Sequence, residues 1–124
     1  MTGTIDEAKL EEFMGQMVGH MTGAALCFGM WLGDELGLYQ VLSGSGTLTA
    51  DEVAGKAGCN SRLVREWLDG QVAGGLVGYD AAADRYHLTP EATLALADEN
   101  SPAFVARAMN AFGSLFKDIE KITG

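Results

Sequence analysis

Residues 49–90 constrain the fold of this chain most strongly, because their capping signals and turns leave few alternative structures. Thr49-Ala50-Asp51-Glu52 has the pattern of a capping box, in which the threonine hydroxyl bonds the glutamate amide and the glutamate carboxylate reaches back to the cap. Leu48 and Val53 flank this box as a hydrophobic staple. The pattern predicts a helix that ends at Gly58, because glycine adopts a left-handed conformation at little cost.

A second helix and a short hairpin are expected directly after this turn. Asn60 or Ser61 caps the helix, and Gly74-Gly75 ends it. Its apolar residues recur at helical spacing and are Leu63, Val64, Trp67, Leu68 and Val72, with Trp67 expected at the centre of the core. Two strand-like runs, 76–79 and 85–88, then surround a polar tip. The predicted fold is therefore mainly α, a winged helix-turn-helix with a short β-hairpin wing.

The segment before this region is strongly apolar and helical. From Asp6 onward, apolar residues fall on one helical face, and they are Leu10, Phe13, Met14, Met17, Val18 and Met21. A break or kink is expected at Thr22 or Gly23, followed by a second helix over residues 24–42. That second helix is apolar almost all round, so either another copy of the chain or a further domain has to cover it.

Two helices are predicted after the hairpin, each beginning with a cap followed by proline. Thr89 and Ser101 are the caps, with Pro90 and Pro102 at the first helical position. The final helix carries an apolar stripe made of Val105, Ala108, Met109, Phe112, Leu115, Phe116, Ile119 and Ile122. This stripe also requires a surface to pack against.

The charge distribution argues against a nucleic-acid-binding role. The formal net charge is −9, and no segment is clearly basic. In the helix that would enter the DNA groove, Arg62 and Arg65 are balanced by Glu66 and Asp69. Affinity for DNA comes largely from neutralising phosphates, for which this face has too few cations. An acidic winged-helix transcriptional regulator is kept as the alternative function.

Several other classes of site find little support in the sequence. Cys27 and Cys59 have no metal-ligand spacing and are expected to be reduced thiols. The loop 43–46 lacks the preceding parallel strand that a nucleotide-binding loop needs. No signal peptide is visible, and the apolar run 24–32 is too short to span a bilayer, so we expect a cytoplasmic protein without a membrane partner.

The order and spacing of these segments resemble a known family. The residues that carry the resemblance lie at 36–42, 48–54, 62–68, 75–77 and 86–91. Together they resemble the N-terminal domain of two-domain, class I S-adenosylmethionine-dependent methyltransferases. The resemblance implies a homodimerisation platform whose helices also cover the small-molecule pocket of a C-terminal Rossmann-like domain. It also implies residues 1–42 as N-terminal dimerisation helices, 43–97 as the winged-helix core and 98–124 as a C-terminal linker helix toward that domain.

The resemblance further implies which side chains contribute to the dimer and to the substrate cover, with ordinary core packing as the alternative role for each. They are Phe13, Met17, His20, Met21, Phe28, Met30, Trp31, Phe112 and Phe116. The Rossmann-like domain with its acidic-Gly-x-Gly loop is absent from this sequence, so no catalytic, cofactor-binding or metal-binding residue is assigned. S-adenosylmethionine is implied only for a full-length enzyme. A third hypothesis is a stand-alone dimerisation module that modulates a related methyltransferase.

Overall fold

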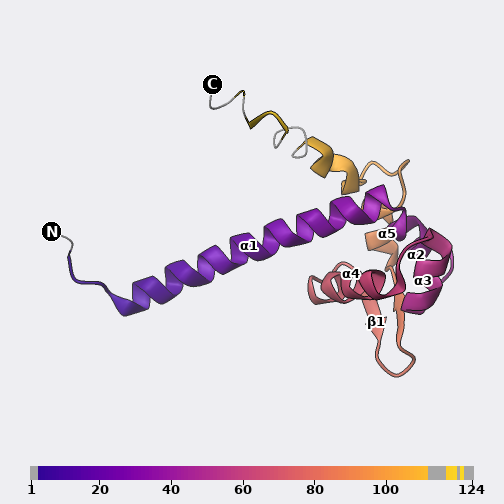
Figure 1. Ribbon diagram of the computed structural model, residues 1–124, viewed down its shortest axis with the longest axis horizontal. Coiled ribbons are helices and arrows are strands. Elements are labelled where there is room, and N and C mark those ends of the chain that lie inside the picture. Colours follow the sequence, from indigo (N-terminus) through magenta and orange to yellow (C-terminus); the bar gives the residue numbers. More distant parts are fainter. Residues whose placement is uncertain (1–2, 112–116, 120, 122–124) are drawn as a thin grey trace.

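One long helix projects from a small winged-helix body. The computed structural model describes residues 3–111, 117–119 and 121. In chain order the elements are α1 (Glu7–Glu35), α2 (Leu38–Ser43), α3 (Ala50–Ala57), α4 (Ser61–Ala73), β1 (Gly78–Asp80), β2 (Arg85–His87), α5 (Pro90–Leu96) and the 3₁₀ helix η1 (Ala106–Met109). Figure 1 shows the N-terminal part of α1 extending away from all the other elements, which cluster around its C-terminal end.

The structure confirms the predicted winged helix-turn-helix. Thr49 caps α3 in a complete capping box, and Gly58 ends that helix with a φ of 68°. Of the two candidate caps for α4, Asn60 is the one whose side chain accepts from the Leu63 amide. Strands β1 and β2 pair antiparallel, and Leu48 joins them through a bridge to Tyr86. The hairpin is therefore held to the segment that leads into α3.

The core lies where α2, α3, α4, α5 and the hairpin meet. Its largest fully buried side chains are Leu38, Tyr39, Leu42, Val53, Leu68 and Tyr86. One prediction for α4 was wrong, because Trp67 was expected at the centre of the core and is only partly buried at its edge. Leu63, from the predicted apolar face of this helix, is 62% exposed. Trp67 instead joins α4 to α1, because its ring contacts Tyr39 and its Nε1 donates to the Gly29 carbonyl oxygen at 2.8 Å.

The predicted break near residue 22 was wrong, because α1 is continuous from Glu7 to Glu35. A single glycine inside a helix costs only about 1 kcal/mol relative to alanine, which the flanking helical turns can offset. The expected helix over residues 24–42 is consequently divided at a different point. Gly37, with a φ of 71°, separates α1 from α2 and lets the chain turn into the core.

The prediction of a helix that begins at Ser101 was also wrong for the first helical turn. The Ser101 hydroxyl accepts from the Ala103 amide in a local turn, and residues 102–105 are not helical. The reason is a set of longer-range contacts. The Val105 amide donates to the Ala95 carbonyl oxygen at 2.9 Å, which folds the segment back along α5. The later residues of the predicted stripe, Phe112, Leu115, Phe116 and Ile122, lie outside the described residues.

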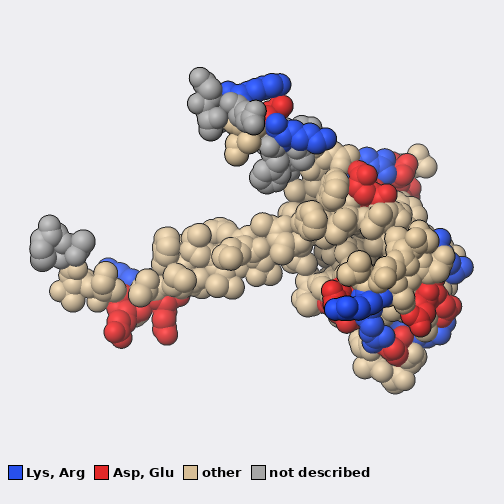
Figure 2. All heavy atoms as spheres, in the orientation of Figure 1, with Lys and Arg blue, Asp and Glu red and all other residues tan. Residues whose placement is uncertain are grey.

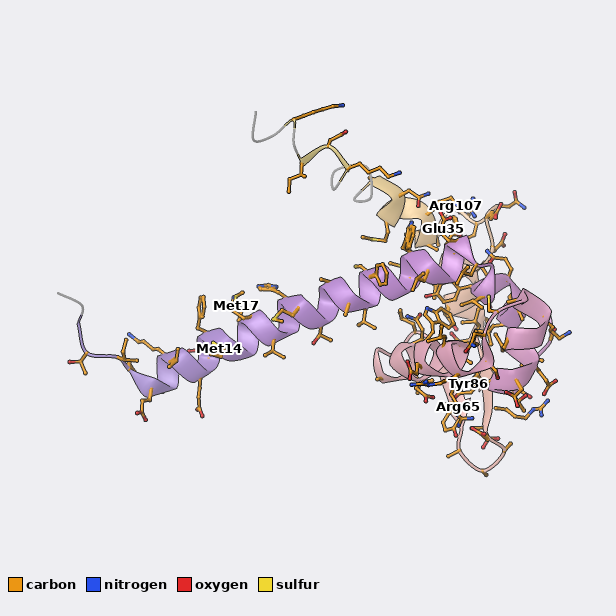
Figure 3. The ribbon with its side chains drawn as sticks, viewed as in Figure 1. Met14, Met17, Glu35, Arg65, Tyr86 and Arg107 are labelled. Atoms are coloured by element: carbon orange, nitrogen blue, oxygen red, sulfur yellow. The ribbon has the colours of Figure 1, made fainter. Side chains whose placement is uncertain are left out.

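An arginine fixes this returning segment to the end of α1. The Arg107 guanidinium donates to both carboxylate oxygens of Asp34, at 3.0 and 2.9 Å, and to Glu99 at 2.7 Å. It also lies 5.1 Å above the Phe104 ring, in a cation–π arrangement. Figure 3 shows Arg107 beside the C-terminal end of α1. The segment after α5 is therefore anchored to the same helix end from which α2 begins.

The wing is tied to α4 through Asp84 at its tip. Arg65 of α4 donates to the two Asp84 oxygens at 3.1 and 2.8 Å, and the Tyr79 hydroxyl donates to the same carboxylate at 2.8 Å. These two donors hold the pKa of the Asp84 carboxyl below its ordinary value of 3.8. Further along α4, the Tyr86 hydroxyl donates to Asp69 at 2.6 Å. Burial, together with this bond, raises the pKa of Tyr86.

Two α1 glycines allow the close approach of α1 to the body. A Cβ added at Gly33 would lie 2.6 Å from Trp67 Cζ2 and would also overlap the Tyr39 ring. At Gly29 an added Cβ would lie 2.8 Å from the side-chain amide nitrogen (Nε2) of Gln71. The backbone of α1 therefore takes the place that side chains usually occupy between packed helices.

We expect Gly33→Ala to lower the free energy of unfolding by about 1–3 kcal/mol, because the added methyl group overpacks a rigid aromatic contact. Gly55→Ala in α3 is the matched control, since nothing lies within 4 Å of its added Cβ. In the control, alanine should raise stability by up to about 1 kcal/mol through its better helix propensity. Urea denaturation measures both changes. A stabilising effect at Gly33 would contradict this account of the α1 contact.

We expect Asp84→Asn to lower the urea midpoint near neutral pH and to have a smaller effect in acid. The folded-state pKa of Asp84 is lowered, so its stabilisation is present above 3.8 and is lost as the pH falls through the lowered value. Asparagine tolerates the positive φ of 52° at this position. An Arg65→Ala background should reduce the effect of the substitution, as a double-mutant cycle will show. A pH-independent difference would refute the role given to this ion pair.

Candidate functional site

The most unusual surface of the molecule is the projecting part of α1, residues 7–25, which we call the arm. Every residue of the arm is exposed. Its apolar face, the arm stripe, consists of Leu10, Phe13, Met14, Met17, Val18 and Met21, with exposed fractions between 39% for Met17 and 68% for Met21. Figure 3 shows Met14 and Met17 far from the body of the molecule. The helix predicted from the apolar spacing is thus confirmed, and its apolar face has no cover from the described residues.

The arm also lacks charges where its apolar face lies. No Asp, Glu, Lys or Arg occurs between Phe13 and Gly33, and Figure 2 shows the charged side chains gathered at the N-terminal end of the arm, on the body and on the C-terminal segment. Burying a large apolar side chain contributes about 1.5–3 kcal/mol. A solvated stripe of this length is therefore suited to association with another apolar surface.

The described side chains among those predicted to face a substrate do not enclose a pocket together. Phe13, Met17, His20 and Met21 are exposed on the arm. Nearer the body, Phe28 is exposed and its ring stacks on the partly buried Trp31 at 5.7 Å between centroids, whereas Met30 packs against the core. Phe112 and Phe116 lie outside the described residues.

A groove lies beside the arm, between the C-terminal half of α1 and the face of α4, and we call it the α1–α4 groove. Its volume is about 710 Å³. The apolar wall residues include Phe28 and Leu32 from α1, Leu36 directly after it, Leu63 and Trp67 from α4, and Cys59 from the turn before α4. The sequence did not predict this groove, although Leu63, on the predicted apolar face of α4, was a signal for an apolar surface there.

Few polar groups line the groove. Glu66 is the acidic residue among them, and its Oε1 lies 3.8 Å from Nε of Arg62 on the same helix. Gln71 is buried, and its Oε1 accepts from the Tyr39 hydroxyl. The groove is thus better suited to apolar side chains than to a charged ligand.

The face of α4 that would contact DNA has its cations engaged in ion pairs. Arg65 binds Asp84 of the wing, and Arg62 faces Glu66. Arg85 of the wing binds Glu52 at 3.1 Å. Each pair leaves little positive potential for phosphates, so the structure supports the argument from net charge.

The loop 43–46 follows helix α2 and leads into the antiparallel bridge of Leu48, which is the setting expected from the sequence. No strand occurs among the residues described before it, so it lacks the geometry of a nucleotide-binding loop. In the part of the chain that the structure describes, no helix is long and apolar enough to cross a membrane.

Comparison with solved structures identifies methyltransferases with the same fold. The chain is similar to PigF, solved with SAH, at 19% identity and a TM-score of 0.70 over 86% of this chain and 32% of that one. It is similar to the mitomycin 7-O-methyltransferase MmcR at 20% identity and a TM-score of 0.74, over 93% of this chain and 36% of that one. It is also similar to human N-acetylserotonin methyltransferase, solved with SAM, at 18% identity and a TM-score of 0.67, over 97% of this chain and 36% of that one. The chain therefore spans about a third of the length of these relatives.

Comparison with curated proteins gave no match. A comparison with family models matched residues 24–98 to the family described as the Rv2258c-like winged HTH domain. The matched region runs from the second half of α1 through α5 and so includes the whole helix-turn-helix and the wing. Because this match covers more than half of the chain, the protein belongs to the Rv2258c-like winged HTH domain family.

Proposed function

We propose that this chain is the dimerisation and substrate-covering domain of a small-molecule methyltransferase that uses S-adenosylmethionine. The observation that carries the proposal is the fully exposed, charge-free apolar face of the arm, carried by a winged-helix body. The similarity of the fold to methyltransferases of about three times this length supports it. An exposed apolar helix in a chain of −9 net charge fits a protein partner better than a nucleic acid.

The described residues of this chain do not fit an S-adenosylmethionine site. Such a site uses a glycine-rich turn after a buried parallel strand, whereas the sheet described here is one two-stranded antiparallel hairpin. In this proposal the methyl donor and the base that deprotonates the acceptor belong to a Rossmann-like domain elsewhere in the enzyme. This chain contributes no catalytic residue.

The substrate-covering role falls to side chains of α1 and of the C-terminal segment. Phe13, Met17, His20 and Met21 supply an apolar surface with one imidazole. Met30 and Trp31 belong to the same proposed set nearer the body, where Met30 also packs against the core. Thioethers are flexible and polarisable, which suits a wall that closes over an irregular small molecule. Phe112 and Phe116 complete the proposed set.

A stand-alone module that modulates a related methyltransferase would share the same dimerising surface. The reading frame after the codon for Gly124 separates these two possibilities. A strand followed by an acidic-Gly-x-Gly turn in that frame would support a domain of a longer enzyme. A stop codon at that point would favour the separate module.

We expect the chain to sediment as a dimer and Met17→Asp to weaken that dimer by at least about a hundredfold. Each of the two copies loses the burial of one large apolar side chain, and about 1.4 kcal/mol corresponds to a tenfold change in affinity. Sedimentation velocity over a dilution series measures the effect.

Gly19→Asp is the matched control for this substitution. It introduces the same charge two residues away, about 200° around the helix from Met17. Nothing lies within 4 Å of a Cβ added at Gly19, so folding should be unaffected. A monomeric wild-type chain, or equal effects of the two substitutions, would refute the proposed role of the arm.

The alternative function, a DNA-binding regulator, gives the opposite expectation in a duplex-binding assay. We expect no measurable binding by fluorescence anisotropy near physiological salt at concentrations up to about 10⁻⁵ M, within the range typical of non-specific binders. The cations of α4 and the wing are already paired with carboxylates. Tight binding with a steep dependence on salt concentration would restore the regulator hypothesis.

A further inference from the structure

One buried side chain of α4 interrupts the apolar face of that helix. The buried residues of α4 are Val64, Leu68 and Gln71, which follow one another at spacings of four and three residues. Gln71 is only 2% exposed, and it also lines the α1–α4 groove. A buried amide requires hydrogen-bond partners for both its oxygen and its nitrogen, because burying either without a partner is unfavourable.

The structure provides a partner for one end of the Gln71 amide. Its Oε1 accepts from the Tyr39 hydroxyl. Burial raises the pKa of Tyr39, so this hydroxyl stays protonated and acts as the donor. The contact therefore directs the amide oxygen toward Tyr39 and leaves the amide nitrogen on the other side.

The nitrogen of this amide is an unused donor in the groove. Gln71 Nε2 has no hydrogen-bond partner among the residues that the structure describes. It lies beside Gly29 of α1, which also lines the groove, so it is at the base of the groove, where α1 and α4 meet. The neighbouring donor, Trp67 Nε1, is already bonded to the Gly29 carbonyl oxygen. A bound molecule with an acceptor would satisfy the Gln71 nitrogen.

The remainder of the groove favours an uncharged and mainly apolar occupant. Leu32, Leu63 and Trp67 contribute apolar surface to its walls. No Lys, Arg or His occurs among the described residues that line it, and Glu66 contributes a carboxylate, so an anion would gain no ion pair there. The volume of about 710 Å³ lies within the range of roughly 300–1,000 Å³ that is typical of small-molecule sites.

A protein helix would satisfy this groove less well than a small molecule. The backbone carbonyls of a helix are bonded within the helix, so an apolar helix would cover the walls and leave the Gln71 nitrogen unpaired. We propose that the α1–α4 groove binds an uncharged, mainly apolar small molecule whose carbonyl oxygen accepts a hydrogen bond from the Gln71 side-chain amide. This site is separate from the arm and goes beyond the dimerisation and substrate-covering role given to it.

The uncharged fluorophore prodan, a naphthalene that carries a carbonyl group, tests whether the groove binds such a molecule. We expect the full chain to bind prodan saturably and to shift its emission to shorter wavelength. Leu63→Glu should weaken binding at least about tenfold, because it places a carboxylate on the apolar wall. Leu94→Glu is the matched control and should leave binding unchanged, since Leu94 is 48% exposed on α5 outside the groove.

A pair of competing ligands tests the hydrogen bond. β-Acetylnaphthalene and β-ethylnaphthalene have nearly the same shape, and the first carries a carbonyl oxygen that the second lacks. We expect the ketone to displace prodan about three- to tenfold more effectively, although it is the less hydrophobic of the two. This preference should persist in Tyr39→Phe, which keeps the amide donor.

The preference should disappear in the double variant Tyr39→Phe with Gln71→Met. This variant replaces both partners of the buried hydrogen bond by apolar groups of similar shape, so it leaves neither partner unpaired and should remain folded. Circular dichroism verifies the fold of each variant. Equal displacement by the two naphthalenes in the wild-type chain would overturn the role given to Gln71 and the proposal with it.

The other outcomes separate this inference from the proposed function. Prodan binding that is absent, or that Leu63→Glu and Leu94→Glu affect equally, would overturn the groove site. A chain that sediments as a dimer and binds no prodan would keep the proposed dimerisation and refute this inference. A monomeric chain with the expected prodan binding and ketone preference would support this inference and refute the dimerisation.

Discussion

The contact between α1 and the winged-helix body determines most of what this molecule presents to its surroundings. Gly29 and Gly33 let the backbone of α1 lie directly against α4, and the Trp67 indole donates to the Gly29 carbonyl oxygen at 2.8 Å. These contacts involve the second half of the helix. The first half has no such support from the described residues and projects as the arm. Any change that separates α1 from α4 therefore alters the arm, the groove and the end of the core together.

The anchored half of α1 explains how an apolar arm can be helical at all. An isolated helix of a few turns is marginal in water, because nucleation is unfavourable and exposed apolar residues gain nothing from it. Here the helix is nucleated on the body, and each further residue of the arm adds a hydrogen bond at the cost of propagation alone. The Asp6 side chain caps the far end by accepting from the Ala8 and Lys9 amides. The apolar face of the arm is therefore already formed in the single chain.

In the winged-helix body, ion pairs occupy cations that a DNA-binding protein of this fold would use to contact phosphates. The cations of α4 and the wing hold the domain together, with Arg65 on Asp84 and Arg85 on Glu52. A cation engaged in this way has to give up its carboxylate before it can contact a phosphate. The fold itself does not specify function, and here the distribution of charge and apolar surface is the better guide.

The sequence by itself determined the elements whose signals are local. The capping box at Thr49, the left-handed Gly58 and the cap at Asn60 act through hydrogen bonds within a few residues, so the winged helix could be predicted from residues alone. The apolar face of the arm followed from periodicity for the same reason. The same periodicity predicted an apolar surface on this chain.

Only the tertiary structure decided the continuity of α1, the path after α5 and the existence of the groove. Local rules allowed a break near Gly23 and a helix from Ser101, and both predictions were wrong. The second was overridden by contacts between residues distant in sequence, such as Arg107 with Asp34. The exposure of Leu63 depends likewise on where α1 lies relative to α4. Periodicity shows that a residue lies on an apolar face, and only the packing of helices shows whether that face is covered.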